Sequence, residues 1–278
     1  MKLDLVDVFG AASLRGNPLG VVHGGETLSD AAMLAFTQWL GFSETTFLLP
    51  PTDPAADYAL RIFYAAGELP FAGHPTLGSC HAWLQAGGVP KHPHRIMQQC
   101  GAGLIEIRRD ADRLAFAAPA FTRYGPLSGA EQLEAARIAG VPLEAIAEAV
   151  HVANGPKWQL LRLRCAADVL AAKPVTRAKD AHVGLAGPTE PGSPVDWEVR
   201  ALFSDQHGAV AEDPVTGSLN AGIACHLFAT GLATQSYVAG QGQKIGADGR
   251  VYCSIDADGR VWIGGRCDAI ATGAQLRV

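Results

Sequence analysis

The stretch Phe71-Ala-Gly-His-Pro-Thr-Leu-Gly-Ser79 opens a run of 22 residues, 69–90, that contains no Asp, Glu, Lys or Arg. Its last part, His74–Ser79, shares Pro, Gly and Ser with Asp213–Ser218, which lies 139 residues further on and opens a second uncharged run, 214–243. Each run is followed by a Gly-rich turn and by two short segments typical of paired strands. This repetition predicts two similar lobes, each with one helix that is apolar on all sides and therefore buried.

The rest of the chain indicates many short strands, because 32 glycines and 17 prolines among 278 residues favour frequent turns. Residues 195–203 alternate apolar and charged side chains, which predicts a half-buried strand. We expect an α+β fold with an N-terminal lobe at 1–124 and a C-terminal lobe at 125–278, and leave open whether the last strand returns to the first lobe. Cap residues predict helices from Ser29 to Gly41 and from Ser128 to Gly140.

Composition excludes several classes of protein. A hydrophobic share of 48% and a charged share of 18% exclude intrinsic disorder. The net charge of −5 argues against a nucleic-acid or anionic-membrane partner. The start of the chain, with Asp4 and Asp7 in its apolar stretch, is unlike a signal peptide, and six widely spaced cysteines are typical of reduced thiols. We expect a soluble, cytoplasmic protein without a membrane span.

The two helix starts are candidate sites for binding a small anion, because unpaired N–H groups and the positive end of the helix dipole meet there. If the lobes face each other, both starts share one cleft that suits a small carboxylate. His74 and Asp213 then occupy equivalent positions. Spacing alone equally allows a loop histidine, an ordinary N-cap and, for Glu44, a solvated surface residue. No metal-ligand spacing and no nucleotide loop occurs, so we expect neither metal nor cofactor.

Five motifs follow one another along the chain: Gly16–Val22, Gly41–Phe47, Phe71–Gly78, Glu212–Ser218 and the region Gln241–Arg250. In this order they resemble the phenazine-biosynthesis PhzF family, which has the diaminopimelate-epimerase-like fold. The resemblance covers residues 6–265, nearly the whole chain. It implies two lobes, each a barrel-like, mostly antiparallel sheet around a central helix, with the site between them. It also implies a homodimer and cofactor-independent isomerisation by proton transfer.

The resemblance also assigns residues to roles. Glu44 matches the family's acid/base glutamate, and His74 and Asp213 match residues that line the same site. We therefore expect an isomerase of biosynthetic metabolism that moves a carbon-bound proton on a small carboxylate-bearing metabolite. The substrate-binding residues implied at the helix starts are Gly73, Gly217 and Ser218.

Two other functions remain open. One is an epimerase or racemase that uses Glu44 with His74 or Asp213 as opposed bases. The other is a non-catalytic protein that binds a small anion. Related racemases use two cysteines at the helix starts, but Cys80 and Cys225 lie further along the uncharged runs. This position disfavours a two-thiol racemase.

Overall fold

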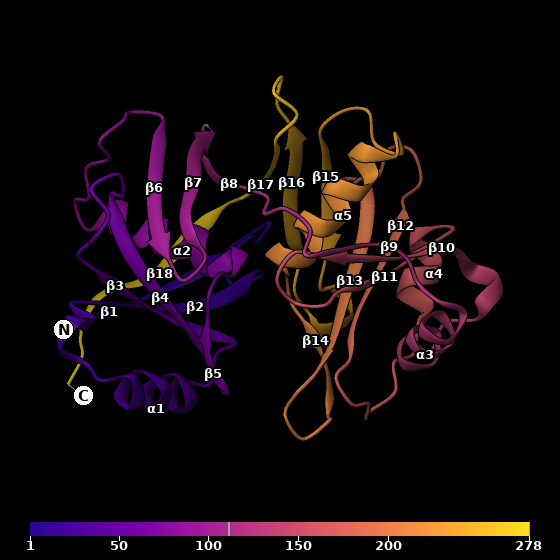
Figure 1. The fold of residues 1–278 in the computed structure, drawn as a ribbon, viewed down its shortest axis with the longest axis horizontal. Coiled ribbons are helices and arrows are strands. Elements are labelled where there is room, and N and C mark those ends of the chain that lie inside the picture. The colour runs from indigo at the N-terminus through magenta and orange to yellow at the C-terminus, as the bar shows by residue number, and fades with distance from the viewer. Residues whose placement is uncertain (111, 278) are drawn as a thin grey trace. The chain divides into compact units, whose positions relative to one another are not determined.

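The computed structural model describes residues 1–110 and 112–277, and the chain folds into two compact units. The first unit comprises Met1–Ala117 and Gly264–Val278, and the second comprises Ala118–Ile263. The chain thus enters the second unit before residue 124 and returns to the first unit through its last strands. Both units are of the α+β class (Figure 1). Within the described residues, no helix combines the length and apolar character needed to cross a membrane.

The first unit is a mixed, mostly antiparallel sheet around a buried helix. Its first strand pairs antiparallel with both the second strand and the last strand of the chain. In Figure 1 the indigo start and the yellow end of the chain therefore run together. The elements are β1 (Lys2–Val8), β2 (Asn17–His23), η1 (Gly25–Thr27), α1 (Asp30–Leu40), β3 (Glu44–Leu49), β4 (Tyr58–Tyr64), β5 (Gly67–Leu69), α2 (Gly73–Gln85), β6 (Arg95–Cys100), β7 (Gly103–Asp110), β8 (Arg113–Ala117) and β18 (Cys267–Gln275).

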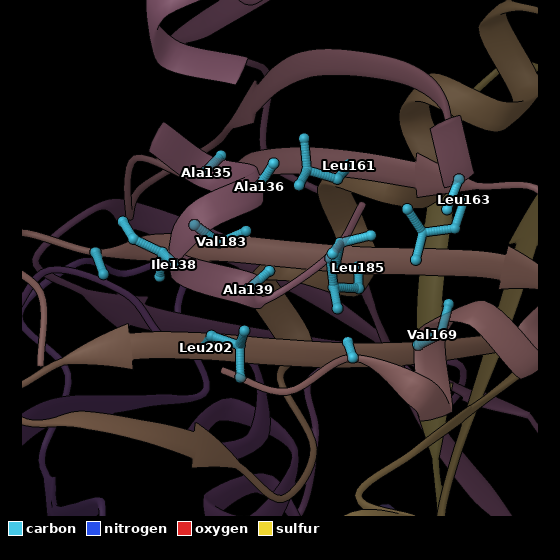
Figure 2. Close-up of a cluster of buried hydrophobic side chains, with 14 of the residues drawn as sticks. Ala135, Ala136, Ile138, Ala139, Leu161, Leu163, Val169, Val183, Leu185 and Leu202 are labelled. Carbon is cyan, nitrogen blue, oxygen red and sulfur yellow. The ribbon is translucent and has the colours of Figure 1, made fainter. Parts of the chain in front are cut away.

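The second unit has the same kind of sheet and additional helices. Small and branched side chains such as Ala136, Leu161, Val183 and Leu185 pack α3 and α4 against strands β11 to β13 (Figure 2). The elements are β9 (Arg123–Pro126), α3 (Gly129–Ala139), η2 (Leu143–Ala145), β10 (Ile146–Ala153), β11 (Gln159–Leu163), α4 (Ala166–Ala171), β12 (His182–Pro188), β13 (Trp197–Ser204), β14 (Val210–Asp213), α5 (Gly217–Ala229), β15 (Tyr237–Gln241), η3 (Gln243–Ile245), β16 (Gly249–Ile255) and β17 (Val261–Gly265).

The two units repeat one connectivity. In the first, β4 pairs antiparallel with β3 and β5, the chain crosses through α2, and β6 then pairs parallel to β4 and antiparallel to β7. In the second, β13 pairs antiparallel with β12 and β14, the chain crosses through α5, and β15 pairs parallel to β13 and antiparallel to β16. The same order of pairings confirms the prediction of two similar lobes.

The central helices α2 and α5 are buried because small residues let strands approach them closely. A Cβ atom added to Gly78 would lie 2.6 Å from Leu19 Cδ2. A Cβ atom added to Gly222, the sixth residue of α5 as Gly78 is of α2, would lie 2.4 Å from the carbonyl oxygen of Val152. Glycine at this position is therefore required for packing in both units.

The structure corrects the register of the repeat. Helix α2 begins at Gly73 and α5 begins at Gly217, so the repeats are offset by 217 − 73 = 144 residues rather than 139. His74 accordingly corresponds to Ser218, and the predicted equivalence of His74 and Asp213 is wrong. The shared prolines are not equivalent in structure, because Pro75 lies inside the first turn of α2 and Pro214 precedes α5.

The predicted caps are confirmed, whereas the predicted half-buried strand is wrong. Ser29 accepts from Ala32 N at the start of α1, and Ser128 forms a capping box with Glu131 at the start of α3. Strand β13 is buried on both faces over most of its length. Its charged side chains Glu198 and Arg200 are only 1% and 4% exposed, because polar partners inside the unit replace water.

Candidate active site

Glu44 is the first residue of β3, and the residue before it is fixed by a buried partner. Ser43 Oγ donates to Asn17 Oδ1 at 3.1 Å, and the Asn17 side chain is fully buried at the start of β2. β3 itself runs parallel to β2 and antiparallel to β4, where Glu44 lies opposite Tyr64. The backbone that carries the Glu44 carboxylate is therefore held on two sides.

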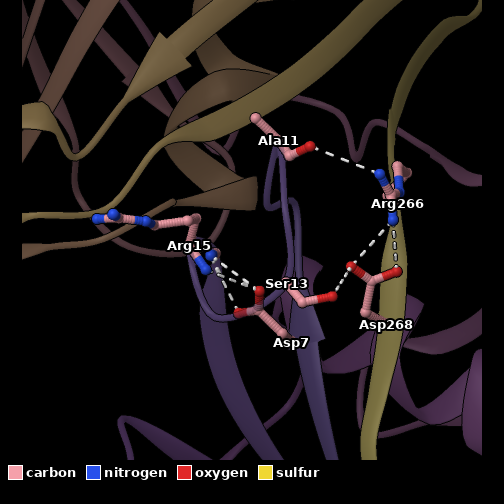
Figure 3. A network of polar contacts seen from close by, with 7 residues as sticks. Asp7, Ala11, Ser13, Arg15, Arg266 and Asp268 are labelled. Carbon is pink, nitrogen blue, oxygen red and sulfur yellow. Dashed lines mark hydrogen bonds and ion pairs between the residues drawn. The ribbon is translucent and has the colours of Figure 1, made fainter.

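A polar network orders the loop that leads from β1 into β2 (Figure 3). The carboxylate of Asp7 accepts from the backbone N–H of Gly16 at 3.0 Å. Asp268 on β18 accepts from Ser13 Oγ at 3.0 Å and from Arg266 Nη2 at 2.8 Å. This loop leads into β2, whose first residue, Asn17, binds Ser43 just before β3. The network therefore supports the position of β3 as well.

His74 lies beside Glu44, with 3.4 Å between His74 Nε2 and Glu44 Oε2. Burial lowers the pKa of His74 to about 3, because desolvation disfavours the charged imidazolium. At neutral pH the contact therefore joins a neutral imidazole to a carboxyl group. Thr46 and Ser79 share a hydrogen bond of 2.8 Å between their hydroxyls, which ties β3 to α2 and so fixes this pair.

The start of α2 supplies further donors next to this pair. The first intrahelical bond of α2 runs from Thr76 N to the carbonyl oxygen of Ala72, so helix geometry leaves the N–H groups of Gly73 and His74 without an intrahelical acceptor. No acidic residue stands in the first turn. This helix start can therefore stabilise negative charge that develops close to Glu44.

In the second unit, Asp213 ends β14 and precedes α5 by a short turn. Its Oδ2 accepts a short hydrogen bond from Thr216 Oγ1. Gly217 and Ser218 are the first two residues of α5, as Gly73 and His74 are of α2. The structure thus brings Asp213, Gly217 and Ser218 together within the second unit, and Glu44, Gly73 and His74 within the first.

Ser218 has two partners that no sequence pattern indicates. Trp158 Nε1 donates to Ser218 Oγ at 3.0 Å, and Asn154 Nδ2 donates to the Ser218 carbonyl at 3.0 Å. An indole N–H can only donate, so the single hydroxyl hydrogen of Ser218 is directed elsewhere. The segment 154–158, Asn-Gly-Pro-Lys-Trp, is typical of a turn, and no local pattern links it to a serine 60 residues further on.

The cysteines do not provide an alternative pair of bases. All six are free, and Cys80 and Cys225 lie on the eighth and ninth residues of α2 and α5, beyond the helix starts. Burial raises the pKa of Cys80 to about 12 and that of Cys225 to about 11, so both stay protonated at neutral pH. This supports the inference against a two-thiol racemase. Across 1–110 and 112–277, no three His, Cys, Asp or Glu side chains are grouped so that they could hold a metal ion.

Comparison with known proteins identifies the family. The family model for phenazine biosynthesis-like proteins, PhzC-PhzF, matches residues 6–273. The chain belongs to this family. Trans-2,3-dihydro-3-hydroxyanthranilate isomerase of Pseudomonas chlororaphis is 33% identical over 80% of this chain and 78% of that protein. Antisense-enhancing sequence 1 of Schizosaccharomyces pombe is 30% identical over 98% of this chain and 97% of that protein.

A solved structure agrees with this assignment. The fold matches that of a predicted epimerase from Pseudomonas aeruginosa with a TM-score of 0.80 and 26% identity, covering 100% of this chain and 99% of that one. Together with the isomerases among its relatives, this places the protein among the isomerases of the PhzC-PhzF family. The resemblance inferred from the five sequence motifs is thus confirmed.

Proposed function

We propose that this PhzC-PhzF protein is a cofactor-independent isomerase that moves a proton between two carbons of a small carboxylate-bearing metabolite. Glu44 carries the proton. The observation that supports this role most directly is the contact of its carboxylate with the neutral imidazole of His74, 3.4 Å away, beside the start of a buried helix. A single carboxylate that takes up and returns a proton is sufficient for such a reaction.

The proposed reaction balances without a second reagent. The Glu44 carboxylate removes a proton from a carbon next to a double bond, and the electron pair of the C–H bond spreads over the allylic system as an anion. The N–H groups at the start of α2 and the Ser218 hydroxyl stabilise this charge by hydrogen bonds. The Glu44 carboxyl then returns its proton to the far carbon of the allylic system, so the double bond has moved and the carboxylate is restored.

His74 and Asp213 are assigned supporting roles in this proposal. A histidine with a pKa of about 3 stays neutral at neutral pH, so His74 donates or accepts a hydrogen bond without charge. Asp213 and the first residues of α5, Gly217 and Ser218, bind the polar groups of the substrate. Formation of a homodimer in the cytoplasm remains a prediction, and light scattering of the purified protein tests the dimer.

Epimerisation is the second candidate, because a relative of known structure is described as a predicted epimerase. A two-base epimerase needs one base unprotonated and the other protonated at the start of the reaction. His74 is unsuited to the protonated role, since its imidazolium loses its proton far below neutral pH. Of the two candidate partners of Glu44, Asp213 is therefore favoured over His74 as the second base of an epimerase.

The test follows carbon-bound hydrogen in deuterated water. The first probe is trans-2,3-dihydro-3-hydroxyanthranilate, the compound named for the Pseudomonas relative, followed by other small cyclic and amino carboxylates. A shifted double bond supports the isomerase, and the share of deuterium at the new position measures how often the proton on Glu44 exchanges with solvent before it is returned. Deuterium at a stereocentre with inversion supports the epimerase instead. A ligand that binds without any exchange or conversion indicates a binding protein and overturns the proposal.

A further inference from the structure

Gln241 is a buried amide that joins every part of the turn between Asp213 and α5. It is the last residue of β15 and is fully buried. Its Oε1 accepts from Thr216 N at 3.1 Å and from Asn220 Nδ2 at 2.8 Å. Its Nε2 donates to the Asp213 carbonyl at 3.0 Å and to Thr216 Oγ1 at 2.9 Å. Each of the two polar atoms of the Gln241 side chain thus has two hydrogen-bond partners, all of them in this turn or in the first turn of α5.

These contacts fix the direction of each hydrogen bond. The backbone N–H of Thr216 can only donate, so the amide oxygen of Gln241 must face it and the NH₂ group must face Thr216 Oγ1. The hydroxyl of Thr216 therefore accepts from Gln241, and its one hydrogen is left to point at Asp213 Oδ2. Gln241 thereby directs the Thr216 hydroxyl hydrogen onto the Asp213 carboxylate.

The first unit contains the same arrangement at the equivalent place. Gln98 on β6 is also fully buried, accepts from the hydroxyl of Tyr58 and donates from Nε2 to Thr76 Oγ1 at 3.0 Å. Thr76 is the fourth residue of α2, and Asn220 is the fourth residue of α5. A buried glutamine on the strand after the central helix thus binds the first turn of that helix in both units. A role in fixing helix starts explains both positions.

We propose that Gln241 is a positioning residue, which holds the Asp213 carboxylate and the start of α5 in the orientation that binds substrate, acting through the Thr216 hydroxyl. The proposal rests on the function proposed above, because it assigns Gln241 to the same site. It goes beyond that function because activity then depends on a buried side chain that presents its NH₂ group to the Thr216 hydroxyl.

Gln241→Glu replaces the NH₂ group of the side chain by an oxygen and leaves the side-chain volume nearly unchanged. The new carboxylate places an acceptor against the Asp213 carbonyl, and the Thr216 hydroxyl then donates to residue 241 instead of Asp213. We expect kcat/KM to fall about 10–100-fold, the usual effect of losing a group that orients a ligand-binding side chain. A crystal structure of this variant should show the Asp213 carboxylate turned away from Thr216 Oγ1.

Thr216 provides variants that avoid a new buried charge. Thr216→Val removes the hydroxyl and should lower kcat/KM about 10–100-fold, whereas Thr216→Ser keeps the hydroxyl and should stay within about threefold of the native enzyme. The double variant Gln241→Glu/Thr216→Val should have the same kcat/KM as the less active of its two single variants. Native activity in Thr216→Val, or losses that multiply in the double variant, would overturn the proposal.

Leu185→Ala is the control for stability alone. Leu185 is fully buried in the cluster between α3 and β12, so this variant should lower the melting temperature while the folded enzyme keeps native kcat/KM. The crystallographic result does not depend on the reaction. If the native protein converts no carboxylate, the proposed function fails, and an unmoved Asp213 in Gln241→Glu separately refutes the positioning role.

Discussion

Residue by residue, the first unit places a carboxylate next to a histidine that cannot be charged at neutral pH. Water would normally stabilise both the imidazolium and the carboxylate, but His74 is 4% exposed and its pKa falls to about 3. In the proposed reaction the exchanged proton is therefore carried by Glu44 rather than by His74. The roles of the two side chains are distinguishable by substitution.

Glu44→Gln should preserve the fold and ligand binding and lower the turnover rate by about 10²–10⁴-fold, because it keeps size and hydrogen bonding but removes the base. His74→Ala and Asp213→Asn should weaken binding as well as rate. Steady-state kinetics on a confirmed substrate, together with ligand titration, separates the two effects. Near-native turnover in Glu44→Gln would exclude Glu44 as the acid/base and make Asp213 the first alternative.

Glu198 should make the stability of the protein depend on pH. Burial raises its pKa to about 7, while Gln243 Nε2 donates to it at 2.9 Å. The unfolded chain releases this proton near pH 4.5, so the folded state loses stability as the pH rises from about 4.5 to 7 and regains none above it. Glu198→Gln should therefore be more stable than the native protein by about 1–3 kcal/mol at pH 8, but not at pH 4. Thermal melts at both values check this difference.

The residues proposed to carry the proton or bind the substrate could be picked out from the sequence more easily than the residues that hold them in place. Glu44, His74 and Ser218 belong to short motifs whose members are close in sequence. Trp158 and Gln241 act through contacts 60 and 25 residues away, and nothing in their local pattern indicates a buried donor. Positioning residues of this kind are defined by tertiary contacts alone.

At the scale of single elements, the central helices depend on glycine for their close packing. In Gly222→Ala the new Cβ would meet the carbonyl oxygen of Val152 at 2.4 Å, and a backbone atom in a buried strand cannot yield easily. We expect a loss of about 1–3 kcal/mol in the free energy of unfolding. Gly129→Ala is the matched control, since the space around the first residue of α3 is open. Chemical denaturation should show that variant to be no less stable than the native protein.

Element boundaries were predictable where capping residues mark them, as at Ser29 and Ser128. The burial of β13 could not be predicted in this way, because alternation of charged and apolar residues normally indicates a strand with one solvent-exposed face. Arg200 can be buried since it donates to Glu212 at 2.7 Å and to the carbonyl oxygen of Ala172 at 2.8 Å. Both partners come from other elements, β14 and the end of α4.

For the molecule as a whole, the repeat of two units was predictable from two uncharged runs, whereas its register required the observed helix starts at Gly73 and Gly217. That both helix starts serve one cleft remains a prediction. A kinetic cycle of Glu44→Gln with Asp213→Asn addresses it in solution, because two residues of one reaction give losses that do not multiply.

Isomerase activity should survive exhaustive chelation. The proposed proton transfer uses a carboxylate and hydrogen-bond donors, and the residues that the structure describes contain no grouped set of metal-binding side chains. Activity measured after dialysis against a strong chelator should match that of the untreated enzyme. Loss of activity that a divalent ion restores would contradict the proposed mechanism.

The path of the chain allows a test of the two units as folding entities. β18 pairs with β1, and Leu276 N donates to the Met1 carbonyl oxygen at 3.1 Å, so the two ends lie together in the first unit. A circular permutant that joins the ends by a short flexible linker and begins at Phe121 makes each unit nearly continuous in sequence. Closing a short loop costs little, so we expect a cooperative thermal transition within a few degrees of the native one.

A second permutant controls for the position of the cut. New ends placed between Val199 and Arg200 interrupt β13, whose backbone pairs with β12, β14 and β15, and this chain should fail to fold. Circular dichroism and melting of both permutants give the comparison. If the permutant that begins at Phe121 also fails to fold, the original order of the chain is itself needed for folding. The two units could then not be made continuous in sequence without loss of the fold.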